Sequence, residues 1–152
     1  MKRVLAIAAV LMMPSGILAQ SVDAARPNSV ADMLRGMGYT ARIETDSYGD
    51  PVIRSAASGV DFTVYFYGCE NGAACLDVQF VAAFDLTDPI SAEAVNSWNF
   101  QTVMGRASID GEGDPYLELY VPGVIGTTPD SFAHTIGLWD QTQSDFLGFI
   151  DW

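Results

Sequence analysis

The sequence predicts an α+β fold in which an antiparallel six-stranded sheet has three helices packed on one face, in the order α-β4-α-β2-α. Two observations predict it. Several segments alternate apolar and polar residues with a period of two, and three others carry apolar residues at helical spacing. Strands that come in runs with few helices favour an antiparallel sheet with one covered face. No internal repeat or linker interrupts residues 20–152, which we expect to form a single domain.

The clearest element is a hairpin within residues 60–85. Its first strand should turn Phe62, Val64 and Phe66 to the core, and Asn71-Gly72 supplies the reversal. If Cys69 faces Cys75, Phe66 pairs with Val78, Val64 with Phe80, Tyr65 with Gln79 and Tyr67 with Asp77. The predicted core face of the second strand comprises Leu76, Val78, Phe80, Ala82 and Phe84, opposite Cys75, Asp77, Gln79 and Asp85. A one-residue slip would destroy this agreement, so the register is well specified.

The remaining elements follow in order. Residues 20–26 should be a loose lead-in, after which Asn28 or Ser29 caps a short helix that ends at Gly38. Strands are expected at 39–46 and 52–57, and the second helix should begin at Asp88-Pro89 with proline in its first turn. Two more strands, 106–110 and 116–121, precede a last helix that starts after Thr128. Its predicted apolar stripe is Phe132, Ile136, Trp139, Gln143, Phe146, Leu147 and Ile150.

The first 19 residues have the pattern of a removable export signal. Lys2 and Arg3 precede an apolar run from Val4 to Met13, and small residues lead to an expected cut between Ala19 and Gln20. A membrane-spanning helix needs about 20 apolar residues, so this run is too short to be an anchor. The sequence therefore predicts a periplasmic or secreted protein without a membrane anchor.

The charge balance limits the class of partner. Removal of the leader leaves five arginines against 19 acidic residues, a net charge of −14. Without a polybasic stretch, binding to nucleic acid or to an anionic membrane surface is disfavoured. A protein or peptide partner fits better, and a homodimer is compatible with the sequence.

The two cysteines are predicted to form a disulfide. Cys69 and Cys75 lie six positions apart in a chain with an export signal, where disulfides form and persist. Redox chemistry would favour a C-x-x-C motif at a helix start, and zinc would need more ligands than one histidine supplies. We expect no cofactor and no metal.

Four short motifs resemble the YbjN-like domain family. They are Gly38-Tyr39, the turn Gly49-Asp50-Pro51, the strand end Phe66-Tyr67-Gly68-Cys69, and Asn96-x-Trp98-Asn99. This family is also described as a bacterial sensory transduction regulator, and its fold is similar to that of type III secretion chaperones, which bind polypeptide and often dimerise. The resemblance covers about residues 28–150 and implies a regulatory or chaperone-like binding domain. The predicted leader and disulfide distinguish this chain from those chaperones, which are cytosolic.

Two candidate chemical sites have weak support. Asp110, Glu112 and Asp114 have the spacing of the first ligands of a calcium loop, but Pro115 and Val121 stand where glycine and a bidentate glutamate belong. An acidic hairpin turn is the favoured interpretation, with a calcium-responsive module as the alternative.

His134 has Ser131 and Asp130 nearby, yet a catalytic triad draws its members from distant segments. A hydrolytic or redox enzyme is therefore the less favoured function, and no catalytic residue is assigned.

Two groups are candidates for binding. Asn96, Trp98 and Asn99 could form a recognition cluster, although a core tryptophan and an asparagine that bonds neighbouring backbone are the more common roles. Tyr65, Tyr67, Tyr116 and Tyr120 all fall on the polar register of their strands, and so on the sheet face away from the helices. Exposed tyrosines suit a recognition surface, and they equally suit simple cross-strand pairing. The sequence thus favours a non-enzymatic module that binds protein or peptide through its open sheet face or a sheet edge.

Overall fold

The computed structural model describes residues 21–57 and 59–152, so the predicted export signal lies outside the described residues. It has the expected α+β architecture. Helix α1 (Pro27–Gly36) precedes strands β1 (Arg42–Thr45), β2 (Pro51–Ala57), β3 (Val60–Tyr67) and β4 (Asp77–Ala83). The chain continues through helix α2 (Ala92–Gln101), strands β5 (Arg106–Ile109) and β6 (Pro115–Val121), and ends with helix α3 (Pro129–Ile150). No described helix is long and apolar enough to cross a membrane.

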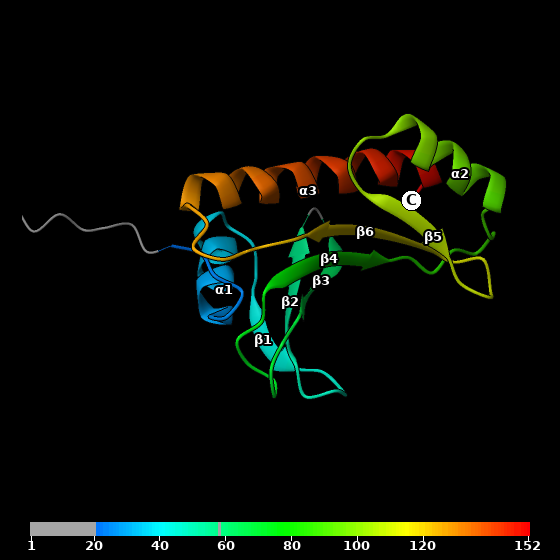
Figure 1. Cartoon of the computed structure of the whole chain (residues 1–152). Helices are drawn as coiled ribbons and strands as arrows, with labels where there is room; N and C mark the ends of the chain where they lie inside the picture. The colour runs from blue at the N-terminus through cyan, green and yellow to red at the C-terminus, as the bar shows by residue number, and fades with distance from the viewer. Residues whose placement is uncertain (1–20, 58) are drawn as a thin grey trace, which may run out of the picture.

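The six strands form one antiparallel sheet in the order β1-β2-β3-β4-β6-β5. The first four strands make the predicted meander, while β6 returns beside β4 and leaves β5 at an edge (Figure 1). The predicted hairpin register is confirmed, because Phe66 pairs with Val78 and Val64 with Phe80.

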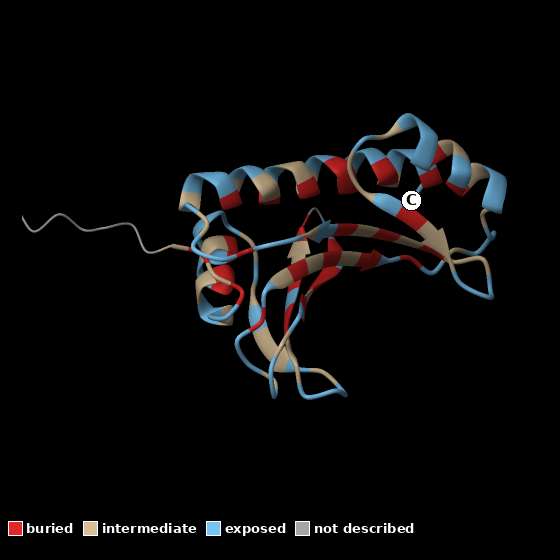
Figure 2. Ribbon diagram, viewed as in Figure 1, coloured by how far each residue is buried: buried red, intermediate tan, exposed pale blue. Residues whose placement is uncertain are grey.

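The core lies between the sheet and α3, which runs along one face (Figure 2). Phe62 and Phe80 from the sheet meet Trp139 from the helix, with ring centroids 5.7 and 5.6 Å apart. Thr128 is the N-cap of this helix, and its hydroxyl accepts a hydrogen bond from the Ser131 N–H. The predicted stripe of α3 is confirmed, because all its members are buried except Leu147, which is partly buried. Burial of these large side chains is the main source of stability.

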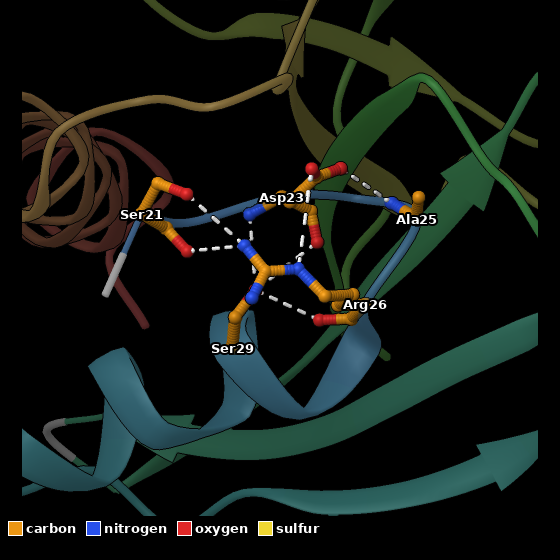
Figure 3. A network of polar contacts seen from close by, with 5 residues as sticks. All are labelled: Ser21, Asp23, Ala25, Arg26 and Ser29. Atoms are coloured by element: carbon orange, nitrogen blue, oxygen red, sulfur yellow. Dashed lines mark hydrogen bonds and ion pairs between the residues drawn. The ribbon is translucent and has the colours of Figure 1, made fainter.

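The segment before α1 is not loose, contrary to expectation. Val22 exchanges two backbone hydrogen bonds with Thr127, at 2.8 and 2.9 Å, and both Val22 and Ala24 are buried. Figure 3 shows the polar side of this segment, where the Arg26 guanidinium donates to the backbone oxygen of Ser21. Short-range sequence patterns could not reveal the tie, because its partner lies about a hundred residues away.

The start of α1 also differs from the prediction. The helix begins at Pro27, and its N-cap residue, Arg26, makes no side-chain capping bond. Ser29, one of the two predicted caps, lies within the helix and accepts a hydrogen bond from the Asp23 N–H at 2.9 Å. Proline in the first turn needs no N–H partner, so the helix can start without a side-chain cap.

The second helix starts later than expected. Asp88-Pro89 does not begin it, and Ser91 is the N-cap of α2, accepting from the Ala94 N–H at 3.1 Å. Leu86 and Ile90 instead donate backbone N–H groups to Asp114 and Gly113 in the β5–β6 turn. These bonds tie the segment to the β5–β6 turn, and the helix begins only after Ser91.

The cysteine end of the hairpin also departs from simple alternation. Cys69 and Cys75 form the predicted disulfide. However, Cys75 is buried and Leu76 is 48% exposed, the reverse of the predicted faces. Gly68 has a φ of +65°, which breaks the regular pleat before the loop, and β4 starts only at Asp77. The period of two therefore does not extend through Cys75 and Leu76.

Candidate functional site on the open sheet face

The sheet face opposite α3 is left open by the helices of the domain and is concave (Figures 1 and 2). Its hollow is a groove of about 610 Å³ that crosses from β1 to β6. The residues that give it polar and aromatic character are Arg42, Arg54, Asp61, Thr63, Tyr65 and Tyr116, and Val81 and Ala83 contribute apolar surface. Mixed aromatic and polar side chains are the composition found in protein interfaces.

The four predicted tyrosines all lie on this open face. Tyr65 and Tyr116 line the groove and are half-buried, whereas Tyr67 and Tyr120 are 42% and 51% exposed. The rings of Tyr67 and Tyr120 are 6.2 Å apart. The sheet therefore gathers two tyrosines in the groove and two beside the disulfide loop, and none is covered by a described helix.

Asp77 holds Tyr120, one of the two exposed tyrosines, in place. Its carboxylate accepts from the Tyr120 hydroxyl at 2.7 Å and from the Gly123 N–H at 2.7 Å. The backbone bond from Gly123 and then the bond from Tyr120 lower the pKa of Asp77. The same contact raises the pKa of Tyr120, while burial and nearby negative groups raise the pKa of Tyr67. Both phenols thus remain neutral hydrogen-bonding groups at neutral pH.

A row of mainly charged side chains crosses the open face. Strand pairing places Arg42, Arg54, Thr63, Val81, Glu118 and Arg106 side by side on all six strands. Glu44 joins the first two, with its carboxylate 2.7 Å from Arg42 and 3.4 Å from Arg54. Arg54 also donates to the Thr63 hydroxyl at 2.6 Å. Our sequence reasoning missed these arginines as site residues, although their place on the polar register was a usable signal.

The asparagine and tryptophan candidates do not join this face. Trp98 is 5% exposed, packs its ring 4.9 Å from that of Phe146, and donates its indole N–H to the Gly105 oxygen. Asn99 bonds the backbone of Ala107 in β5, and Asn96 is exposed on α2. The geometry favours the structural role for Trp98 and Asn99.

The acidic turn is organised around backbone groups. Asp110 accepts from the N–H groups of Asp114 and Glu112, and these bonds lower its pKa. The Asp114 carboxylate in turn accepts from the Leu86 N–H. Within residues 21–57 and 59–152, no group of three acidic, histidine or cysteine side chains is placed to hold a metal ion. His134 is exposed on α3. The geometry therefore favours the hairpin-turn interpretation of these acids.

The comparison with protein families agrees with the fold and motifs described above. A family model, YbjN, described as "Putative bacterial sensory transduction regulator", matches residues 26–152. No curated protein and no solved structure gave a significant match. The match defines a regulatory or binding domain as the class of protein, and its description names no reaction. The chain belongs to the YbjN family.

Proposed function

We propose that this domain is an exported, non-enzymatic module that binds a protein or an extended peptide on the open face of its sheet. One observation carries the proposal: a concave face with a groove of about 610 Å³ and four tyrosines is left uncovered by the domain's own helices. Tyrosine supplies a large apolar ring and a polar tip, a composition enriched in protein interfaces. Membership of a family described as a regulator supports a binding role.

The face is favoured over one edge of the sheet as the binding surface. The outer side of β5 is occupied at Ala107, whose backbone N–H and oxygen are both bonded by the Asn99 side chain. A peptide that added to this edge as a strand would have to displace those two bonds. The open face requires no such displacement.

The test is partner capture with a double variant, Tyr65→Ser with Tyr67→Ser. We leave Tyr120 unchanged because it holds Asp77. The exported protein should capture a defined partner from periplasmic extract, identified by mass spectrometry, and the double variant should bind it more weakly by about 1–3 kcal/mol. Tyr48→Ser is the matched control, because Tyr48 is 91% exposed on the β1–β2 turn, away from the groove.

Equal capture by the wild type and the double variant would contradict the proposal. Thermal unfolding of each variant separates a binding defect from a folding defect. The two substitutions should change the unfolding temperature much less than loss of a core ring such as Phe66, because half-exposed rings have less burial to lose.

A further inference from the structure

The groove gathers positive charge in a strongly acidic protein. Two of the five arginines that follow the leader, Arg42 and Arg54, line it. By contrast, only one of the 19 acidic residues, Asp61, is among the residues that line it. The lining side chains therefore sum to a charge of +1, and Glu44, which contacts both arginines, brings the local sum to zero in a chain that is otherwise strongly acidic. The guanidinium groups lie on the β1–β2 side of the groove, where they are available to a bound ligand.

The two arginines already hold one carboxylate. Glu44 places one oxygen 2.7 Å from Arg42 Nη2 and the other 3.4 Å from Arg54 Nε. Two cations share this single anion, so the cluster keeps a net charge of +1. Among the described contacts, none engages Arg42 Nη1 or Arg54 Nη2. A guanidinium offers five donors in a planar fork, so each arginine can bind a further carboxylate oxygen.

Contacts with Thr63 and Glu44 hold the Arg54 guanidinium in position. Arg54 donates Nη1 to the Thr63 hydroxyl at 2.6 Å, and Thr63 is 7% exposed. Glu44 on one side and Thr63 on the other fix the plane of the Arg54 guanidinium. Less conformational entropy is lost when a ligand binds donors that are already oriented.

The rest of the groove suits an extended chain. From Arg42 on β1 it crosses β2, β3 and β4 to Tyr116 on β6, four strand spacings or about 19 Å. An extended peptide rises about 3.3 Å per residue, so about six residues would fill this length. The rings of Tyr65 and Tyr116, with Val81 between, offer apolar contact beyond the arginines.

We propose that the groove binds an acidic, extended segment of a partner polypeptide, with a glutamate or aspartate carboxylate on Arg42 and Arg54. Apolar side chains of the same segment pack against Tyr65 and Tyr116. This inference rests on the proposed function and adds the chemistry of the partner. The net charge, −12 for the whole sequence and −14 without the predicted leader, would repel an acidic peptide at long range, but at physiological ionic strength such repulsion is screened beyond about 8 Å. The contact with the arginines lies within that distance.

The experiment uses the exported protein and two fluorescent probes. One is a short peptide in which glutamate alternates with valine, and the other has glutamine at every glutamate. Fluorescence anisotropy at physiological ionic strength should show binding at least about tenfold tighter for the glutamate peptide. Added salt should weaken that binding, since a contact between opposite charges is screened. Equal affinities, stronger binding at high salt, or no binding of either peptide would overturn the inference.

Arginine variants locate the contact. Arg54→Gln should remove most of the preference for glutamate over glutamine, and Arg54→Lys should retain part of it, because lysine keeps the charge without the fork. Arg35→Gln is the matched control: it removes the same charge from α1, and Arg35 and Arg54 have similar side-chain exposures of 47% and 50%. A preference that survives Arg54→Gln and Arg42→Gln in folded protein would overturn the proposal.

The two proposals fail in different ways. If tyrosine substitution abolishes partner capture while both peptides bind alike, the open face is a binding surface and the preference for acidic segments is wrong. If tyrosine substitution changes nothing, the proposed function itself fails.

Discussion

The Asn99 side chain closes the outer edge of β5 by bonding both backbone groups of Ala107. Its amide nitrogen donates to the Ala107 oxygen at 3.0 Å, and its amide oxygen accepts from the Ala107 N–H at 2.8 Å. This imitates the pair of bonds that a neighbouring strand would make. An open strand edge is a template for unwanted pairing, so one side chain of α2 both joins the helix to the sheet and protects its edge.

Replacement of Asn99 by leucine should lower the free energy of unfolding by about 1–2 kcal/mol, because two backbone groups lose their partners. It should also increase self-association, since the edge becomes available to a second chain. Urea unfolding and analytical ultracentrifugation measure the two effects. Asn96→Leu is the control, because Asn96 is exposed on the same helix; an equal loss from both variants would contradict this role for Asn99.

Two glycines provide a matched test of loop packing. Gly49 and Gly72 have positive φ values, +92° and +74°, which L side chains rarely adopt, so alanine at either site should cost about 1 kcal/mol or more. At Gly49 an added methyl meets open space, whereas at Gly72 it would collide with the backbone oxygen of Gly49. Gly72→Ala should therefore destabilise the domain more than Gly49→Ala in urea unfolding. Equal losses would mean that the β1–β2 turn and the disulfide loop do not pack together.

The Asp77 contact predicts a specific dependence of stability on pH. Hydrogen bonds lower the pKa of Asp77 in the folded protein below its ordinary value of 3.8. The ionised group therefore contributes stability at pH values above about 4, and this contribution is lost as the pH falls through the lowered pKa. Asp77→Asn should flatten part of the fall in unfolding free energy below about pH 4. Identical acid dependence in wild type and variant would show that the carboxylate is not held as described.

The disulfide should stabilise the domain by restricting the unfolded chain. Replacement of Cys69 and Cys75 together by serine should lower the free energy of unfolding by about 2 kcal/mol in the chain-entropy model for so short a loop. Denaturant unfolding gives the value, and non-reducing peptide mapping by mass spectrometry should find the two cysteines linked. Two free thiols in the folded protein, purified without reductant, would contradict the bond.

Thr63 shows how the curvature of the sheet changes exposure on the open face. Thr63 shares the polar register of its strand with Tyr65 and Tyr67, but it is 7% exposed and its hydroxyl accepts a hydrogen bond from Arg54. Curvature of the sheet makes this face concave, so neighbouring side chains cover a residue that a flat strand would expose. Thr63→Ala should therefore lower the free energy of unfolding more than the same change at an exposed threonine would. The loss should still be smaller than the roughly 3–5 kcal/mol expected for Phe66→Ala.

The sequence by itself determined the features that depend on neighbours along the chain. Period-two alternation defined the hairpin strands, and the facing cysteines set a register in which Phe66 pairs with Val78. Helical spacing identified the buried stripe of α3, because 3.6 residues per turn relates positions only a few residues apart. It also placed the four tyrosines on the open face, since alternation decides the side of a strand.

Tertiary structure decided what depends on distant segments and on curvature. Val22 is fixed by Thr127, and the start of α2 is delayed by bonds to the β5–β6 turn, which no local pattern encodes. The groove arises because β1, β2, β3, β4 and β6 bring Arg42, Arg54 and Tyr116 onto one concave surface. Alternation reports which face a residue occupies, but only the strand order and the bend of the sheet determine which residues of that face meet.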